Sequence, residues 1–321
     1  MTSRPHDALF KLAFEAPADV APLLRELLPP ALRDAIAWET LDHEPVSFID
    51  PELADHHGDL LFSARTRIGD SGLLYFLLEH QSTEDPVMPL RASSYQLRIW
   101  DRFRKEHPGA PLPLIFTLLV SHAPGGWTAA RSFEELFDPE LMAIPGVAGL
   151  VPRFSILALD LAGQSDEALR ARSLAAFQKV ALWLLRDSRD PSRLLGNFDA
   201  WAPMILEAGR IRGRDGLAAL FSYMFRVVDR VNHDELRAKI RELGARPQGV
   251  AVTIAEYLHE EGRKVGLEQG RVATLRSLLV FKFQALSDEH EARLKAADPE
   301  AIERYLQRLL TADSLAAVFA D

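Results

Sequence analysis

The periodicity of hydrophobic and polar positions differs between the two halves of the 321-residue chain. Up to about residue 160, helical apolar faces are interspersed with apolar runs of strand length that are bounded by turn residues. From Ser165 onward the apolar positions recur every three or four residues, which is typical of amphipathic helices. The pattern predicts an α/β fold, in which a mixed sheet flanked by helices precedes an all-helical C-terminal region.

The first half begins with helices and continues with five segments expected to be strands. Residues 6–28 have a helical pattern that Pro17 divides in two, and residues 31–37 could add one more turn. The predicted strands are 44–49, two strands within 56–82, 112–120 and 154–160. Residues 112–120 are apolar on both faces, as expected of a strand in the centre of a sheet. A helix between the third and fourth strands favours a crossover connection.

The segment His56–Ser82 reads as a hairpin with polar groups at one end. A turn about Gly69 pairs residues whose numbers sum to 138, so Asp59 would face Glu79 with Cβ atoms roughly 5 Å apart. Gln81 returns to the same face because side chains alternate along a strand. We therefore predict that Asp59, Glu79 and Gln81 converge at one edge of an otherwise apolar hairpin.

This convergence would be costly without compensation. Two carboxylates about 5 Å apart repel by roughly 3 kcal/mol at an effective dielectric constant of 20. Either one of them stays protonated, or a cation neutralises both. Mg²⁺ or Mn²⁺ suits an Asp and a Glu that leave positions open for water. The alternative is that Asp59 and Glu79 only mark strand ends in solvent.

A basic stripe is predicted on the helix at residues 89–105, which begins eight residues after Gln81. Its members are spaced seven, four and three residues apart and therefore share one side of the helix: Arg91, Arg98, Arg102 and Lys105. The stripe cannot lie far from the carboxylates, so we expect it to contact the phosphate backbone of a nucleic acid. A solvated helix face is the alternative.

The second half is expected to consist of helices. Beyond a helix from Ser165 to at least Leu184, the predicted helices are 192–208, 214–231, 233–243, 275–286, 288–296, 299–311 and a short one near 313. Residues 244–249 (GARPQG) are predicted to be a linker, which gives three regions: 1–163, 164–249 and 250–321. Three glycines spaced by four (Gly262, Gly266 and Gly270) indicate a flexible helical linker or close helix–helix contact, through which the C-terminal helices could form a homo-oligomer.

Composition and motifs narrow the chemistry. The chain has no cysteine, which excludes disulfides, thiolate zinc sites and cysteine nucleophiles. It has no run long enough to span a membrane and no signal-peptide core, so we expect a protein of the cytoplasm. The net charge of −9 argues against a protein that coats nucleic acid but permits a local basic groove. His56 and His57 could assist a metal, although neighbours on a strand point in opposite directions.

Several motifs occur together in one order: PHDALFKLAF at 5–14, Trp38, SFID at 47–50, DLLF at 59–62, LLEHQS at 77–82 and MPLRASSYQLRIW at 88–100. Over roughly residues 4–160 the chain thereby resembles the recombination-promoting nuclease family, also called the putative transposase family. The glycine repeat and its trailing helices resemble the tail of that family more loosely. The resemblance implies a PD-(D/E)XK-like fold and a Mg²⁺-dependent DNA endonuclease that acts on double-stranded DNA and is linked to recombination and mobile DNA.

The resemblance also implies roles for individual residues. The acidic pair of the family falls on Asp59 and Glu79, which would hold the ion together with the backbone carbonyl of His80. The position usually held by lysine falls on Gln81, which can orient a water molecule but cannot supply positive charge. More is then left to the ion and to nearby Arg91 or Arg98.

Two other functions stay open. The acidic pI near 5.6 and the missing lysine suit an inactive nuclease fold that serves as a DNA-binding or assembly module. A cut-and-paste transposase would need a third acid, for which Asp160 at the end of the last strand is the candidate. A strand-terminal Asp is, however, more often a turn or cap residue.

Overall fold

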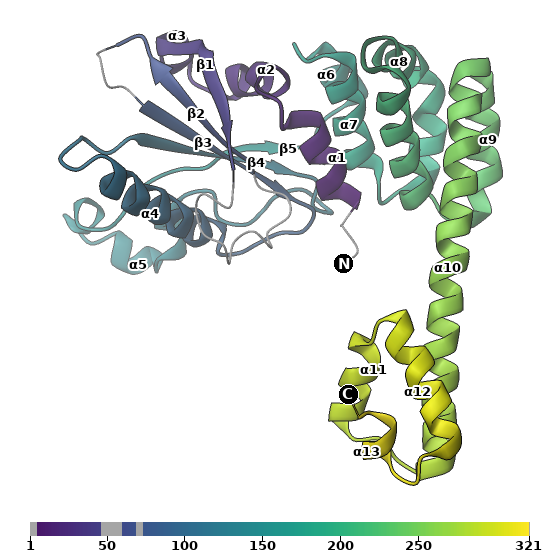
Figure 1. Cartoon of the computed structure of the whole chain (residues 1–321). Coiled ribbons are helices and arrows are strands. Elements are labelled where there is room, and N and C mark those ends of the chain that lie inside the picture. The colour runs from purple at the N-terminus through teal and green to yellow at the C-terminus, as the bar shows by residue number, and fades with distance from the viewer. Residues whose placement is uncertain (1–4, 46–59, 69–72, 321) are drawn as a thin grey trace. The chain divides into compact units, whose positions relative to one another are not determined.

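The computed structural model describes residues 5–45, 60–68 and 73–320, with the side chains of 259–262 and 264–269 excepted. The chain forms two compact units, Met1–Ala251 and Val252–Asp321. The first unit contains the sheet and nine of the α-helices of Figure 1, and the second is helical. The predicted α/β class, with a helical C-terminal region, is confirmed.

Five strands form one mixed sheet in the order of the chain: β1 Ile36–Glu44, β2 Leu60–Thr66, β3 Leu73–Gln81, β4 Leu114–Ser121 and β5 Leu157–Asp160. The pairs β1–β2 and β2–β3 are antiparallel, whereas β3–β4 and β4–β5 are parallel. Parallel neighbours need a crossover, and α4 (Met88–Glu106) provides it between β3 and β4. The central strand β3 is buried at seven consecutive positions, which is why its sequence is apolar on both faces.

The predicted register of the hairpin is confirmed over the residues that the structure describes. Leu60 faces Leu78, and the pairing continues to Arg65 opposite Leu73, so that each pair of numbers sums to 138. The turn around Gly69 and Asp59 both lie outside the described residues. The pairing of Asp59 with Glu79 therefore stays a prediction.

The first strand lies earlier in the chain than we predicted. It is β1, Ile36–Glu44, whereas residues 46–49 of the predicted strand 44–49 are not described. An irregularity between Ala37 and Asp42 interrupts the pairing of β1 with β2, and Thr40 donates to the carbonyl of Ala37 within it. A bulge breaks the alternation of apolar and polar residues by which a strand is recognised.

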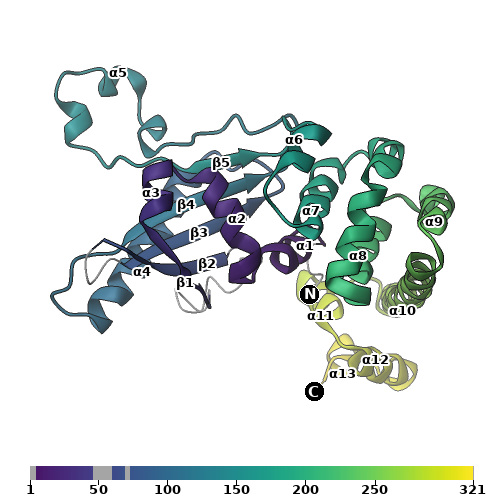
Figure 2. The ribbon, with the colours of Figure 1, turned by 90° about the horizontal axis from the view of Figure 1, so that it is seen from above.

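Helices cover both faces of the sheet, as Figures 1 and 2 show: α1 (Pro5–Phe14) and α2 (Pro17–Leu27) on one face and α4 on the other. The ring of Phe10 on α1 stacks on His80 at a centroid distance of 4.6 Å. On the opposite face Tyr95 and Ile99 of α4 pack with a cluster that contains Leu61, Tyr75 and Leu77. Even-numbered residues at the end of β3 thus face α1, and odd-numbered residues, Glu79 included, face α4.

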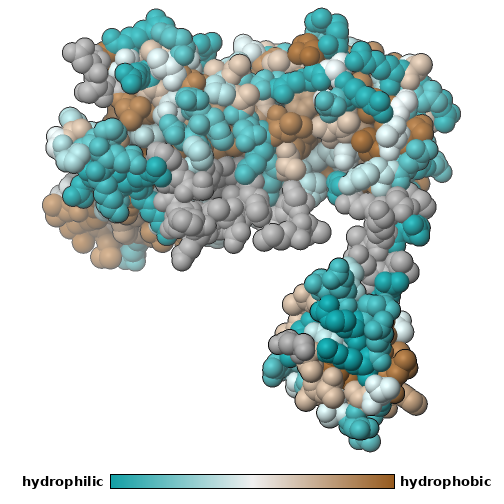
Figure 3. Space-filling model, viewed as in Figure 1, coloured by the Kyte–Doolittle hydropathy of each residue, from teal (hydrophilic) through white to brown (hydrophobic). Residues whose placement is uncertain are grey.

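The predicted division at Pro17 and the additional turn, α3 (Pro30–Ala35), are both present. Between β4 and β5 the chain makes an excursion with short helical turns at η3 (Phe133–Leu136), α5 (Pro139–Met142) and η4 (Val147–Gly149). Several apolar side chains of this excursion are exposed: Phe137, Leu141, Ile144 and Leu150. Figure 3 shows apolar atoms gathered on the side of the molecule where α5 lies in Figure 1.

The helices that complete the first unit are α6 Asp166–Ala171, α7 Ala176–Asp187, α8 Pro191–Val227, η5 Arg230–Asn232 and α9 His233–Glu242. The single helix predicted from Ser165 to Leu184 is wrong, because the chain leaves the helical path between α6 and α7. There the carboxylate of Glu26 accepts hydrogen bonds from the side chain of Arg172 at 2.7 Å and from the backbone N–H of Ser173 at 2.6 Å. The predicted boundary before residue 214 appears inside α8 as a non-helical residue, Gly213, with φ +68°.

Residues 244–249, which were predicted to be a linker, are helical from Ala245 onward. A single helix, α10, runs from Ala245 to Phe283, and Gly244, directly before it, has a positive φ, +110°. Pro247 lies in the first turn of α10, where the missing N–H would have had no intrahelical acceptor. Pro and Gly here begin a helix instead of interrupting one.

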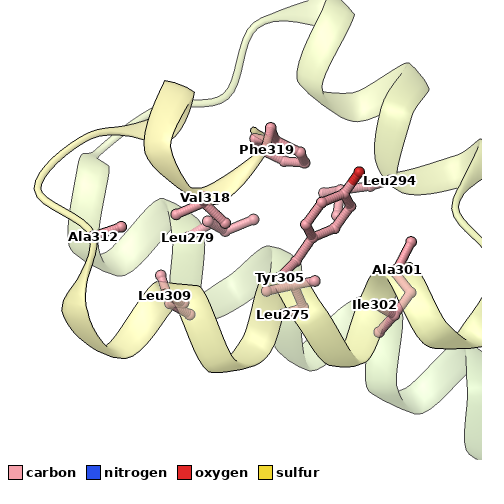
Figure 4. Close-up of a cluster of buried hydrophobic side chains, with 10 residues drawn as sticks. All are labelled: Leu275, Leu279, Leu294, Ala301, Ile302, Tyr305, Leu309, Ala312, Val318 and Phe319. Carbon is pink, nitrogen blue, oxygen red and sulfur yellow. The ribbon is translucent and has the colours of Figure 1, made fainter. Parts of the chain in front are cut away.

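The second unit has its own small core. The later part of α10 packs with α11 Asp288–Ala296, α12 Pro299–Thr311 and α13 Leu315–Val318, and each of these three begins at a side-chain N-cap, Ser287, Asp298 or Ser314. Figure 4 shows the buried cluster, in which Leu275 and Leu279 of α10 lie with Leu294, Tyr305, Leu309 and Phe319. Within the described ranges, no helix is long and apolar enough to cross a membrane.

Candidate functional site

Glu79 lies near the carboxyl end of β3, on the face that α4 covers, and its side chain is completely buried. Its Oε2 accepts a hydrogen bond from Nη2 of Arg91 at 2.6 Å. Its other oxygen, Oε1, is buried and has no hydrogen-bond partner among the described residues. Burying an ionised carboxylate is expensive unless a partner compensates for the lost hydration. Arg91 compensates for one of the two oxygens of Glu79 and leaves the other available to a ligand.

The unpartnered oxygen suits a cation. Hard divalent ions such as Mg²⁺ bind carboxylate oxygens, and a buried Oε1 without a hydrogen-bond donor is an unsatisfied acceptor of that kind. Among residues 5–45, 60–68 and 73–320, however, no group of three or more histidine and carboxylate side chains is arranged to hold a metal ion. The second predicted ligand, Asp59, lies outside the described residues, as do His56 and His57.

Arg91 belongs to the predicted basic stripe, and the structure brings it to the carboxylate itself. Nη1 of Arg91 donates to Oδ2 of Asp85 at 3.1 Å, so the guanidinium bridges Asp85 and Glu79. The Arg91 side chain is 26% exposed, compared with 0% for Glu79. The Arg91 side chain is therefore partly reachable from solvent, although its Nε is buried, whereas the Glu79 carboxylate is fully shielded.

The remaining predicted residues lie on the same elements. Gln81 is half-buried at the end of β3, two residues from Glu79, and its carbonyl accepts a hydrogen bond from the N–H of His122 at 3.0 Å. On α4, Arg98 is half-buried, Lys105 is exposed, and Arg102 donates to Glu106 at 2.8 Å. The helical prediction for this segment is confirmed, while the roles of these side chains stay predictions.

Asp160 anchors a loop. Its Oδ2 accepts from the backbone N–H of Trp127 at 2.7 Å, and its Oδ1 accepts from the N–H of Ala162 at 3.1 Å. Both oxygens are thus used by backbone donors, which agrees with the turn role considered for a strand-terminal Asp. Glu84, which the sequence analysis did not single out, similarly accepts from the N–H groups of Thr128 and Ala129. These hydrogen bonds lower the pKa of Glu84.

Sequence reasoning missed a group of histidines on the opposite face of the sheet. Nδ1 of His80 lies 3.1 Å from Oδ1 of Asp7, and its Nε2 lies 3.1 Å from Nδ1 of His122. The ring of His6 lies 4.9 Å from that of His122, and Nδ1 of His6 lies 2.8 Å from the hydroxyl of Tyr223. The five residues come from α1, β3, the end of β4 and α8, so no local motif announces them.

Burial keeps the outer histidines of this group neutral. Desolvation, with positive charge from His80 and Arg189, lowers the pKa of His6 to about 4 and that of His122 to about 2. Burial raises the pKa of the Tyr223 hydroxyl. The side chain of His80 is engaged on this face, so only its backbone carbonyl is available to the predicted metal site on the other side of β3.

Comparison with known proteins gives several matches. The model of a family described as "Putative transposase, YhgA-like" matches residues 4–200. Recombination-promoting nuclease RpnD of Escherichia coli O157:H7 is 28% identical over 263 residues, which cover 81% of this chain and 96% of RpnD. Recombination-promoting nuclease RpnA of Escherichia coli K12 is 27% identical over 304 residues, which cover 91% of this chain and 97% of RpnA.

A third relative differs in its described activity. The inactive recombination-promoting nuclease-like protein RpnE of Escherichia coli K12 is 28% identical over 274 residues, which cover 84% of this chain and 86% of RpnE. No solved structure matches the chain.

Proposed function

The chain belongs to the YhgA-like transposase family, and from that premise we propose that it is a Mg²⁺-dependent DNA endonuclease that acts in recombination. The family match covers residues 4–200, and relatives named recombination-promoting nucleases align over most of their length. The single observation that carries the proposal is the buried carboxylate of Glu79, with one oxygen on Arg91 and the other without a hydrogen-bond partner among the residues that the structure describes.

The order of elements supports a PD-(D/E)XK-like core. An antiparallel hairpin, β2–β3, leads through α4 to the parallel strand β4, in the order that the family resemblance implies. In this proposal Asp59 and Glu79 hold the ion with the carbonyl of His80. When bound, Mg²⁺ would polarise the scissile phosphate and lower the pKa of a bound water molecule.

The other residues would position the substrate. Gln81, on the same face as Glu79, would orient the attacking water by a hydrogen bond. Three side chains of α4 would contact phosphates of double-stranded DNA: Arg98, Arg102 and Lys105. Such contacts fix the register of a protein on DNA without reading its sequence, which suits a nuclease of low sequence preference.

A second candidate function is a catalytically degenerate module that binds DNA or assembles with partners. The Glu79–Arg91 pair favours it, because Arg91 already neutralises the carboxylate without any metal ion. The neutral Gln81 at the lysine position and the relative named inactive point the same way.

A plasmid-nicking assay decides between the two. Supercoiled plasmid is incubated with the protein and Mg²⁺, with EDTA as the blank. The variants Asp59→Asn and Glu79→Gln are compared with Glu15→Gln, which changes an exposed carboxylate directly after α1. We expect nicking by the wild type and by Glu15→Gln only. Nicking that persists undiminished in both site variants would contradict the endonuclease. Mn²⁺ titration by calorimetry, with binding lost in Glu79→Gln, would argue against the degenerate module.

A further inference from the structure

The proposed active site has no cation at position 81, the position that the resemblance to PD-(D/E)XK nucleases assigns to lysine. Gln81 is uncharged at every pH, so it cannot stabilise negative charge that develops on a phosphate. Among the described residues, the cation seen against Glu79 is Arg91, whose Nη2 lies 2.6 Å from Oε2. Arg91 comes from the first turns of α4, ten residues after Gln81 in the chain.

Residue 81 and the Glu79–Arg91 pair lie on the same face of the sheet, the face that α4 covers. Glu79 and Gln81 are odd-numbered residues of β3, and α4 packs on that face through Tyr95 and Ile99. Six residues, 82–87, connect the end of β3 to the start of α4. A positive charge can therefore reach Glu79 either from the strand or from the helix without a change of fold.

Arg91 is held in place from two sides. Nη1 donates to Asp85 and Nη2 donates to Glu79, which fixes both terminal nitrogens of the guanidinium. Asp85 is itself anchored, since its Oδ1 accepts from the backbone N–H of Val87 at 3.0 Å. A guanidinium fixed in this way loses little conformational freedom when it meets a substrate.

The exposure of the pair fits a role toward substrate. The Arg91 side chain is 26% exposed and Glu79 is buried, so an approaching phosphate would meet Arg91 before Glu79, while a ligand of Oε1 would share the same carboxylate. A purely structural counter-ion would satisfy a buried carboxylate at both oxygens, whereas Oε1 has no partner in the described part of the chain.

We propose that Arg91 is a catalytic residue that contacts the scissile phosphate and supplies, from α4, the positive charge that Gln81 cannot. Asp85 is the positioning residue that orients its guanidinium. The inference rests on the proposed endonuclease function and adds to it the source of electrostatic stabilisation.

The test moves the charge between the two positions. Four proteins are compared in plasmid nicking: wild type, Arg91→Gln, Arg91→Lys and the double variant Gln81→Lys with Arg91→Gln. Loss of one donor to a developing oxyanion typically costs on the order of 100-fold in kcat, so we expect a loss of about that size in Arg91→Gln. Arg91→Lys should regain part of the activity, and the double variant at least about tenfold, because its lysine restores charge on the same face.

Two further readouts separate catalysis from folding. Thermal unfolding followed by circular dichroism reports whether each variant folds, and calorimetry with Mn²⁺ reports ion binding. We expect Arg91→Gln to bind Mn²⁺ at least as tightly as the wild type, because removing a nearby positive charge reduces repulsion of the ion. A folded, ion-binding Arg91→Gln that nicks plasmid like the wild type would overturn the role of Arg91. So would a folded double variant that stays as slow as Arg91→Gln.

A further variant applies if Arg91→Gln does not fold. Asp85→Asn keeps an oxygen for the N–H of Val87 and keeps the Arg91–Glu79 pair, but weakens the hold on the guanidinium. We expect kcat to fall about tenfold with KM nearly unchanged, in line with the cost of misplacing a catalytic group, and an unchanged kcat would overturn the inference. A wild type that nicks no plasmid with Mg²⁺ or Mn²⁺ would instead overturn the endonuclease itself and the role of Arg91 with it.

Discussion

Nδ1 of His80 lies 3.1 Å from Oδ1 of Asp7, although 73 residues separate them in the chain. Through this contact α1 is tied to β3 on the face opposite Glu79. The His80 side chain is completely buried and Asp7 is 15% exposed, so the contact is largely shielded from solvent. On its other side, Nε2 of His80 lies 3.1 Å from Nδ1 of His122, which extends the connection to the end of β4.

Asp7→Asn should destabilise the first unit. The substitution keeps the size of the side chain but removes the charge from a shielded hydrogen bond, which is typically worth about 1.5–3 kcal/mol. We expect the free energy of unfolding in urea to fall by about that amount. Asp34→Asn is the matched control, because its side chain is 79% exposed and should change stability little. Equal effects of both substitutions would show that the contact with His80 contributes nothing.

The histidine group predicts acid sensitivity. Burial lowers the pKa of His6 from 6.5 to about 4 and that of His122 from 6.5 to about 2. Below pH 6.5 the unfolded chain therefore takes up protons that the folded protein does not, and the folded state loses stability as the pH falls. Each histidine can contribute a slope of up to about 1.4 kcal/mol per pH unit, for His6 down to about pH 4.

Urea unfolding at a series of pH values between 7.5 and about 4.5 would measure this slope. We expect His122→Gln to reduce the slope and the exposed His107→Gln to leave it unchanged. A stability that stays constant between pH 7 and 5 would contradict the burial of these two imidazoles as neutral groups.

Two neighbouring glycines should respond differently to alanine. Gly125 and Gly126 both have left-handed backbone conformations, with φ +80° and +90°. Alanine at either position therefore costs about 1 kcal/mol of stability, because a residue with a Cβ disfavours this conformation. A Cβ on Gly125 would meet nothing within 4 Å, whereas one on Gly126 would lie 2.8 Å from Oδ2 of Asp160. We expect Gly126→Ala to lower the free energy of unfolding by at least about 1 kcal/mol more, as overpacking typically does. Thermal unfolding that ranks the two equally would contradict this account of the loop.

A buried ion-pair network in the helical part of the first unit predicts a larger effect. Asp187 is completely buried; its Oδ1 accepts from Nε of Arg186 at 2.7 Å and its Oδ2 from Nε1 of Trp183 at 2.8 Å. Asp187→Ala would leave the guanidinium of Arg186, which is 1% exposed, with Asp166 as its remaining acid. Breaking such a pair typically costs about 3–5 kcal/mol, and urea unfolding should show a loss in that range.

The surface pair Arg237–Asp234 provides the comparison for that network. Asp234 is 93% exposed, so Asp234→Ala should cost less than about 1 kcal/mol. If the two substitutions had similar effects, the buried network would not stabilise the unit.

The sequence was sufficient where structure is determined locally. The apolar run of β3 and the amphipathic pattern of α4 predicted both elements and the register between β2 and β3. The sequence pattern did not predict features that depend on contacts between residues far apart in the chain. Glu26 captures the backbone at Ser173, 147 residues away, and thereby ends a helix that the local pattern would continue.

The candidate site likewise combines a feature that the local sequence predicted with contacts that it could not predict. A carboxylate at the end of an apolar strand marked Glu79 as unusual, because burial of such a group requires a partner. The pattern could not tell that Arg91 would be that partner, since four basic residues of α4 share one stripe and only packing decides which of them meets Glu79. The contacts among the histidines could not be predicted from the sequence, because His6, His80 and His122 meet only after three elements have assembled.

The long pairing of β3 with β4 limits where residues can be inserted into the chain without disturbing the candidate site. Residues Leu74–Gln81 pair in parallel with Leu114–Ser121 without interruption. A slip of one residue would turn the Glu79 carboxylate toward α1 and carry the neighbouring imidazole toward α4. Insertions within β3 should therefore be rejected during evolution. The excursion between β4 and β5, which exposes Leu141 and Leu150, is the kind of segment in which additions can accumulate without moving β3.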